Sequence, residues 1–156
     1  HRIGGLEKAD VTGKVSYDTH NHERMTRLRA EKVARVVQDV PDLEVHGDPD
    51  GGELLVLGWG STLGAITGAV NQAREQGKPV SRAHLRWLNP FPANLGEVLA
   101  RFDKVLLPEM NMGQLALLLR GHFLIDVQSY TKIEGKPFTR QEISDQIDRQ
   151  LGASRS

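Results

Sequence analysis

The chain has 156 residues, of which 38% are hydrophobic and 26% charged, a composition typical of a globular domain with its own core. Twenty basic residues balance twenty acidic ones, and no apolar run approaches the ~20 residues of a membrane span, so neither nucleic acid nor a membrane is expected as a partner. The chain has no cysteine, which excludes disulfides, a thiol nucleophile and thiolate ligands for zinc or iron–sulfur clusters.

The first 52 residues are predicted to be a linker followed by an amphipathic helix. Residues 1–20 are rich in glycine and charge, without an apolar period. Asn21 is a candidate N-cap for a helix over 22–38, whose apolar residues approximate one buried stripe. Its basic residues suggest nucleic acid, but two acidic residues interrupt them, which favours a solvated or subunit-facing surface. The turn-rich segment 41–52 then separates this helix from the main unit.

From Glu53 onward the pattern alternates between strands and helices, which predicts a domain over 53–151 and a tail over 152–156. The predicted strands are 53–57, 79–85, 104–107 and 123–127, and the predicted helices are 61–76, 93–102, 112–119 and 140–151. Gly77 and Gly121 are expected to end two helices, and Thr139 with Glu142 has the spacing of a capping box. Short links between strand and helix indicate an α/β fold, with helices on both faces of a mostly parallel sheet.

In such a sheet, functional residues gather at the carboxyl ends of the strands. The first such junction is the turn GWGST, with Gly58, Gly60, Ser61 and Thr62. Its free N–H groups could bind a phosphate or carboxylate, or the turn is simply capped and holds no ligand. It lacks both the third glycine of a dinucleotide fingerprint and the lysine of a P-loop.

The second junction, RWLNPFP, predicts a stiff, protruding segment because it holds two prolines. Arg86, Trp87, Asn89 and Phe91 are candidate interface residues, since aromatic residues and arginine dominate protein interfaces. The alternative is that Trp87 and Phe91 pack inward over the edge of the sheet.

The third junction, PEMNMGQL, joins an acid, two amides and a glycine. Glu109 could be a general base if it is buried, or a structural carboxylate that accepts hydrogen bonds from backbone N–H groups. Asn111 can cap the following helix, Gly113 permits close approach, and Gln114 lies in the first turn. The histidines show no metal-ligand spacing, and no GxSxG elbow is present, so neither catalytic nor metal-binding residues are predicted.

Three ordered motifs, ELLVLGWGSTLGAITGAVNQAREQGKPVSRAHLRWLNPFP, FDKVLLPEMNMGQLALLLRG and VQSYTKIEGKPF, resemble the alpha subunit of 2-oxoacid:ferredoxin oxidoreductases, and its 2-oxoglutarate branch above all. The preceding GGLEKADVTGKVSYDTHNHERMTRLRAEKVARV is similar to the segment before this domain there. The strand–turn pattern also occurs in the C-terminal domain of transketolase-like enzymes. The resemblance implies a three-layer sandwich with a mostly parallel sheet of four to five strands and room for one antiparallel edge strand.

This family oxidatively decarboxylates a 2-oxoacid to an acyl-CoA and reduces ferredoxin, with thiamine diphosphate, magnesium, iron–sulfur clusters and coenzyme A. The resemblance implies that the chain is the transketolase C-terminal-like part of a longer, cytoplasmic alpha subunit. It would hold no cofactor and would contact the remaining domains of that subunit, a thiamine-diphosphate-binding beta subunit and, indirectly, ferredoxin. The residues of the three junctions would then border an interface or ligand. The alternative is a small module that holds coenzyme A or a nucleotide at the GWGST turn.

Overall fold

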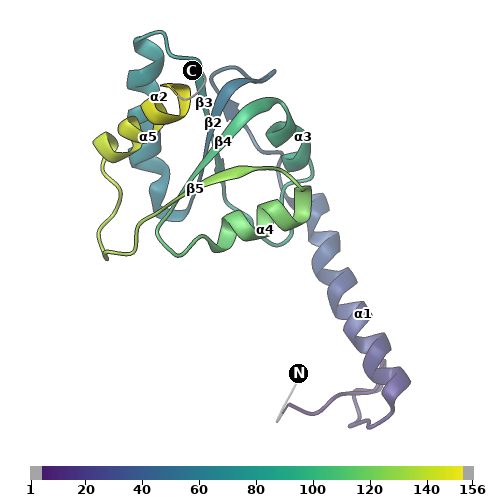
Figure 1. The fold of residues 1–156 in the computed structure, drawn as a ribbon. Coiled ribbons are helices and arrows are strands. Elements are labelled where there is room, and N and C mark those ends of the chain that lie inside the picture. The colour runs from purple at the N-terminus through teal and green to yellow at the C-terminus, as the bar shows by residue number, and fades with distance from the viewer. Residues whose placement is uncertain (1–4, 153–156) are drawn as a thin grey trace. The chain divides into compact units, whose positions relative to one another are not determined.

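The computed structural model describes residues 5–152 and divides the chain into two compact units (Figure 1). One unit runs up to Pro41 and includes Asn89–Phe91, and the other holds Asp42–Leu88 and the chain from Pro92 onward. The first four residues of the predicted linker, and the predicted tail after Gly152, lie outside the described residues.

The first unit is built on helix α1 (Thr19–Arg35), which continues into the short 3-10 helix η1 (Val36–Asp39). The N-cap of α1 is Asp18, whose carboxylate accepts the His20 N–H at 3.0 Å, so the prediction of Asn21 as the cap is wrong. The predicted buried stripe is also wrong for this structure, because no residue of α1 is buried in the described part of the chain.

The segment before α1 is held to the helix by polar contacts rather than by a core. Lys8 and Val15 form an isolated antiparallel bridge, and the Asn21 amide donates to the Lys8 carbonyl at 2.9 Å. Glu7 accepts two hydrogen bonds of 3.1 Å from the Arg29 guanidinium, which is the largest of the effects that lower its pKa to about 2. The side chain of Asn21 is thus engaged elsewhere, which explains why it does not cap the helix.

The second unit contains one sheet of five strands, as the fold prediction requires. The strands are β1 (Val45–His46), β2 (Gly52–Trp59), β3 (Val80–Leu85), β4 (Phe102–Glu109) and β5 (Val127–Thr131), in the order β1-β3-β2-β4-β5. β1 runs antiparallel to β3 at the edge, and every other pairing is parallel. β1 lies in the segment that the turn residues marked as a loop.

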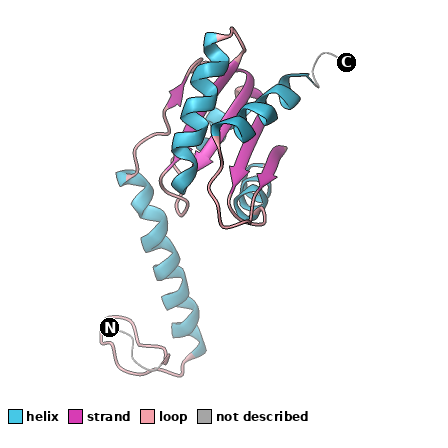
Figure 2. Ribbon diagram, turned by 90° about the vertical axis from the view of Figure 1, so that its left-hand side faces the viewer, coloured by secondary structure: helices cyan, strands magenta, loops and turns pink. Residues whose placement is uncertain are grey.

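Helices cover both faces of this sheet and make it the middle of three layers (Figures 1 and 2). α2 (Leu63–Glu75), preceded by the 3-10 helix η2 (Gly60–Thr62), and α5 (Arg140–Gly152) lie on one face. α3 (Leu95–Ala100) and α4 (Gln114–Phe123) lie on the other. The core between the sheet and the first pair of helices is mainly aliphatic and also includes the ring of Phe138. It contains Leu54, Val56, Leu106, Ile66, Ala69, Val70, Ile143 and Ile147. Among residues 5–152, no helix is long and apolar enough to cross a membrane.

The last strand and the helix before it differ from the prediction. β5 begins at Val127, where the predicted strand ends, because α4 runs through Gly121 and reaches Phe123. A glycine inside a helix costs only about 1 kcal/mol relative to alanine. The packing of Phe123 against α3 offsets this cost. The approach is close, since a Cβ added at Gly96 would lie 3.0 Å from the Phe123 ring. α4 ends instead at Leu124, which adopts a left-handed conformation with φ of 55°.

The capping box at the start of α5 is confirmed. The Thr139 N–H donates to the Glu142 carboxylate at 2.7 Å, and the Glu142 N–H donates to the Thr139 hydroxyl at 3.2 Å. Lys132 Nζ also donates to both carboxylate oxygens, at 2.7 and 2.9 Å. These bonds from Lys132, followed by that from the Thr139 N–H, lower the pKa of Glu142 to about 2.

Candidate functional site

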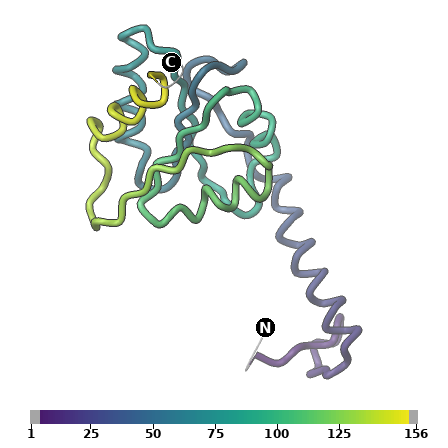
Figure 3. The backbone as a smooth tube through the Cα atoms, in the orientation of Figure 1, coloured from purple at the N-terminus to yellow at the C-terminus, as the bar shows by residue number. Residues whose placement is uncertain are grey.

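The carboxyl ends of the parallel strands meet at one edge of the sheet, and the chain can be followed through each turn there in Figure 3. β2 ends at Trp59 and β4 at Glu109, and a side-chain contact joins the turns that follow. The Ser61 hydroxyl lies 3.4 Å from the Met110 sulfur. The structure therefore brings the first and third predicted junctions together.

Glu109 is completely buried, and its carboxylate holds the beginning of α4. One oxygen accepts the Leu115 N–H at 2.9 Å. The other accepts the Ala116 N–H at 3.2 Å and the Ser129 hydroxyl at 3.3 Å. Each oxygen therefore has a donor from the chain itself, and the contacts are those of a structural carboxylate at a positively polarised helix start.

The amides of the third junction also bond within it. Asn111 Oδ1 accepts the N–H groups of Gly113 at 2.7 Å and Gln114 at 3.3 Å. The Gln114 side chain accepts the Met112 N–H at 3.0 Å, and Gln114 is the first residue of α4, in the first turn as predicted. Gly113 has φ of 91°, and a Cβ there would lie 3.4 Å from the Ser129 hydroxyl. The helix begins two residues later than predicted and its N-cap is Gly113, so the prediction of Asn111 as the N-cap is wrong, although Asn111 Oδ1 does bind the N–H of Gln114, the first residue of α4.

The GWGST turn is closed by its own threonine. The buried Thr62 hydroxyl donates to the Trp59 carbonyl at 2.9 Å and accepts the Trp59 N–H at 3.1 Å. Gly60 has φ of 58°, which favours glycine. A Cβ added at Gly58 would lie 2.9 Å from His84 Nδ1, so strand β3 approaches closely here.

His84 is a residue of this edge that motif and spacing arguments missed. It is half-buried, and the Nδ1 atom is buried with no hydrogen-bond partner in the part of the chain described. Burial lowers the pKa of His84, the positive charge of Arg86 lowers it further, and a backbone hydrogen bond at Gly60 opposes both. The neutral imidazole is therefore favoured near pH 7. The alternation of Arg82 and His84 in β3, followed by Arg86, predicts a common side of the strand but does not reveal the close approach of His84 to Gly58.

The residues of the second junction do not form one group. Arg86 and Trp87 belong to the second unit and are exposed, with Trp87 at 40%, so Trp87 does not pack inward. Asn89 and Phe91 belong to the first unit, on either side of a cis peptide bond between Asn89 and Pro90. Asn89 is exposed and Phe91 is half-buried.

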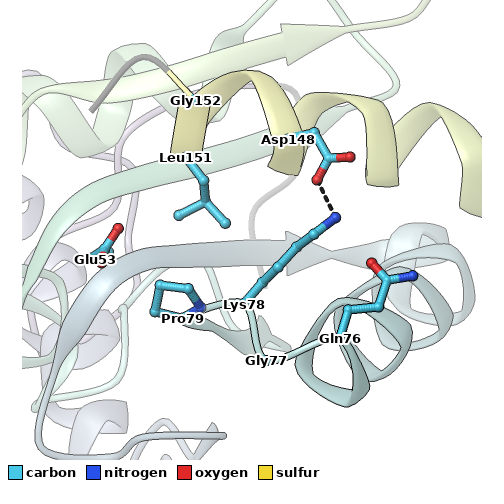
Figure 4. A pocket seen from close by; sticks show the side chains of 8 residues that line it. All are labelled: Glu53, Gln76, Gly77, Lys78, Pro79, Asp148, Leu151 and Gly152. Carbon is cyan, nitrogen blue, oxygen red and sulfur yellow. Dashed lines mark hydrogen bonds and ion pairs between the residues drawn. The ribbon is translucent and has the colours of Figure 1, made fainter. Parts of the chain in front are cut away.

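A shallow pocket of about 420 Å³ lies at the opposite edge, where β2 and β3 begin (Figure 4). Its lining residues are Glu53, Gln76, Gly77, Lys78, Pro79, Asp148, Leu151 and Gly152. Lys78 and Asp148 point toward each other and form an ion pair of 2.5 Å. Among residues 5–152, no group of three or more His, Asp or Glu side chains is placed to hold a metal ion.

The architecture places the second unit in a known fold class. It is a three-layer α/β sandwich of the type found in the C-terminal domain of transketolases. A split-gene transketolase shares the fold, with a TM-score of 0.54 at 14% identity, over 70% of this chain and 41% of that one. Residues 52–143 match the family model of the pyruvate:ferredoxin oxidoreductase core domain II. The chain belongs to this family, which confirms the resemblance to 2-oxoacid:ferredoxin oxidoreductases that the sequence motifs indicate.

Similar proteins carry related names and are much longer. A 2-oxoglutarate oxidoreductase subunit KorA of Mycobacterium tuberculosis is 54% identical over 143 residues, which cover 92% of this chain and 22% of that protein. Subunit alpha of 2-oxoacid:ferredoxin oxidoreductase 2 from Aeropyrum pernix is 36% identical, over 96% of this chain and 24% of that one. The chain thus spans about a quarter or less of the curated relatives that it matches.

A solved structure supports the same relationship. The 2-oxoglutarate:ferredoxin oxidoreductase of Magnetococcus marinus, determined with 2-oxoglutarate, coenzyme A and succinyl-CoA bound, matches with a TM-score of 0.87 at 31% identity. The match covers 97% of this chain and 27% of that one. The family relationship therefore extends over nearly the whole chain, including the segment before the family model begins.

Proposed function

We propose that this chain is core domain II of the alpha subunit of a cytoplasmic 2-oxoglutarate:ferredoxin oxidoreductase, which converts the 2-oxoacid to an acyl-CoA and passes electrons to ferredoxin. The observation that carries the proposal is the 54% identity to the Mycobacterium tuberculosis subunit over 92% of the chain. The small-ligand module is not favoured, because the relatives are subunits of a large oxidoreductase.

Within that complex, the proposed role of the domain is assembly rather than chemistry. Glu109, which could have been a base, has both carboxylate oxygens engaged by the backbone of α4. Arg86 and Trp87 are exposed at the same edge of the sheet and are available for contacts. We propose residues 53–151 as the functional domain and residues 1–52 as its linker and helix. The partners would be the remaining domains of the alpha subunit, a thiamine-diphosphate-binding beta subunit and, through the complex, ferredoxin.

The residues present do not fit the inorganic cofactors of such a complex. Iron–sulfur clusters are held mainly by cysteine thiolates, and this chain has no cysteine. Among residues 5–152, no group of three or more His, Asp or Glu side chains is placed to hold a metal ion such as the magnesium of a diphosphate site. These groups would therefore be held elsewhere in the complex, and no reaction step is assigned to this domain.

The test is to isolate the complete alpha subunit that contains this sequence, together with any chains that co-purify, and to measure their intact masses. Reduction of ferredoxin or a viologen dye should require both 2-oxoglutarate and coenzyme A, and pyruvate should replace 2-oxoglutarate poorly. A preference for pyruvate would overturn the assignment of the substrate. Absence of any 2-oxoacid-dependent reduction would overturn the assignment as an oxidoreductase.

The proposed role of the edge is tested separately in the same complex. Replacing both Arg86 and Trp87 by alanine should weaken association with the other subunits in sedimentation, while the circular dichroism of the 156-residue chain stays unchanged. Gln76→Ala is the control, since Gln76 is exposed at the opposite edge. If the double variant assembles as well as the wild type, this edge of the sheet does not contribute to the interface.

A further inference from the structure

The outward side of α4 carries large aliphatic side chains that this chain leaves uncovered. Leu117 is 66% exposed and Leu118 is 57% exposed. Gly121 follows one turn later, and Leu124, directly after the helix, is 89% exposed. Leu117, Leu118, Gly121 and Leu124 are called the α4 outer face below.

The fold of the domain does not require these leucines. α4 meets the sheet through Leu115, Ala116 and Leu119, which are all buried and lie on the opposite side of the helix. When a helix packs on a sheet and its outer side faces water, that outer side normally carries polar residues. Adjacent exposed aliphatic residues are instead typical of a surface that another protein surface covers.

The end of the helix adds an independent observation. Leu124 has φ of 55°, a left-handed conformation that is unfavourable for leucine and that glycine or asparagine usually provides at a helix end. Its side chain nevertheless has almost no cover within the chain. Gly121 leaves open space, since a Cβ added there would meet nothing within 4 Å. Gly121 therefore adds no side chain between the leucines, and a partner could approach the helix backbone closely there.

The chemistry of the surface indicates an uncharged partner. None of the residues of the α4 outer face carries a charge. The neighbouring Arg120 is turned toward β5, where its guanidinium donates to the Val127 carbonyl and lies 3.8 Å from Asp126. An acidic or basic partner would therefore find no opposite charge on this face. Removing an apolar partner surface from water costs little free energy of desolvation.

The geometry points to an interdomain contact. We propose that the α4 outer face packs against an apolar surface of another domain in the same, longer alpha-subunit polypeptide. The curated relatives are about four times the length of this chain, so most of such a polypeptide would lie outside it and is available as the covering surface. This inference rests on the proposed function, since that function supplies the longer polypeptide.

The experiment compares side-chain oxidation by hydroxyl radicals, followed by mass spectrometry, in the 156-residue chain and in the complete alpha subunit. Leu117 and Leu118 should be oxidised roughly fivefold more slowly in the complete subunit, since side chains at the centre of an interface are as closed to solvent as those of a protein interior. Leu117→Glu in the complete subunit should restore fast oxidation of Leu118. Ile133→Glu, at a residue 68% exposed outside α4, is the matched control and should not.

Equal oxidation rates in the two proteins would refute the proposal. Sedimentation provides a second decisive outcome: a dimer of the 156-residue chain that Leu117→Glu abolishes would make a second copy the occupant instead. The readout requires no turnover, so it is separate from the test of function. Protected leucines in a subunit without 2-oxoglutarate activity would refute the proposed function and leave the packing surface in place.

Discussion

Replacing Glu109 should destabilise the second unit more than replacing any other polar residue of the strand-end turns. Its carboxylate accepts the Leu115 and Ala116 N–H groups at 2.9 and 3.2 Å, in a position without solvent exposure. A buried N–H group left without an acceptor costs roughly 1–3 kcal/mol. The attraction between a carboxylate and a helix start contributes roughly 0.3–1 kcal/mol more. The variant no longer has to bury a carboxylate, which offsets part of this cost. We therefore expect Glu109→Ala to lower the free energy of unfolding by about 3–4 kcal/mol.

Two further variants separate the contributions at this position. Glu109→Gln keeps one acceptor oxygen but turns an NH2 group toward a backbone donor, so it should lose about 2 kcal/mol. Ser129→Ala removes one hydrogen bond, which is 3.3 Å long, and should lose about 0.5–1 kcal/mol. The expected order of stability is therefore wild type, Ser129→Ala, Glu109→Gln, Glu109→Ala.

Urea unfolding of the 156-residue chain at pH 7, followed by circular dichroism, measures these differences. With a urea dependence of roughly 1–2 kcal/mol per molar, Glu109→Ala should lower the midpoint by about 1.5–4 M. A loss below 1 kcal/mol for Glu109→Ala, or a Glu109→Gln variant as stable as wild type, would show that the carboxylate does not hold α4.

Three other substitutions test neighbouring features. Gly58→Ala should lose about 1–3 kcal/mol in urea unfolding, because the new Cβ would lie 2.7 Å from the nearest side-chain atom, while Gly64→Ala, with open space, should not destabilise. Lys132 holds the pKa of Glu142 at about 2, below its ordinary value of 4.5, so this stabilisation is complete above pH 4.5 and is lost toward pH 2. Glu142→Gln should therefore flatten the dependence of the urea midpoint on pH between 5 and 2. Leu124→Gly should raise the melting temperature of the 156-residue chain, since glycine relieves about 1 kcal/mol of left-handed strain.

The sequence predicts the elements of this fold where the determining contacts are local. The spacing of Thr139 and Glu142 identifies the start of α5, because both partners of the capping box lie within one turn. The prediction for β5 fails because Gly121 resembles a helix end, whereas Phe123 packs against Gly96 on another helix. That contact joins residues 27 positions apart, and no local pattern reveals it.

The distinction between local and long-range contacts also separates the site residues that could be predicted from those that could not. The hydrogen bonds of Glu109 and Asn111 could be expected from the sequence, because their side-chain oxygens lie within seven residues of the N–H groups that they bind. His84 could not be predicted, because its position depends on the register that pairs it with Gly58 on the neighbouring strand. Burial and the charge of Arg86 then shift its pKa, and both follow from the folded sheet rather than from the spacing of residues.

The polar groups at the start of α4 are already engaged within the chain, which leaves recognition to other surfaces. The N–H groups of its first turn are bound by Asn111, Glu109 and the Gly113 carbonyl, so an anion could bind there only by displacing the chain's own oxygens. Two exposed apolar surfaces of the second unit are Trp87, which follows β3, and the α4 outer face, which follows β4.

These two surfaces should contribute independently to assembly of the complete subunit. β2 lies between β3 and β4, so the ends of these strands are about two strand spacings, roughly 10 Å, apart. Substitutions of residues that lie more than about 7–10 Å apart and share no partner usually add within about 0.5 kcal/mol. In a double-mutant cycle of Trp87→Ala and Leu117→Ala, measured by the urea midpoint for dissociation of the complex, the combined loss should equal the sum of the single losses. A coupling above 1 kcal/mol would mean that both side chains contact the same partner group, and the edge and the helix would then form one interface.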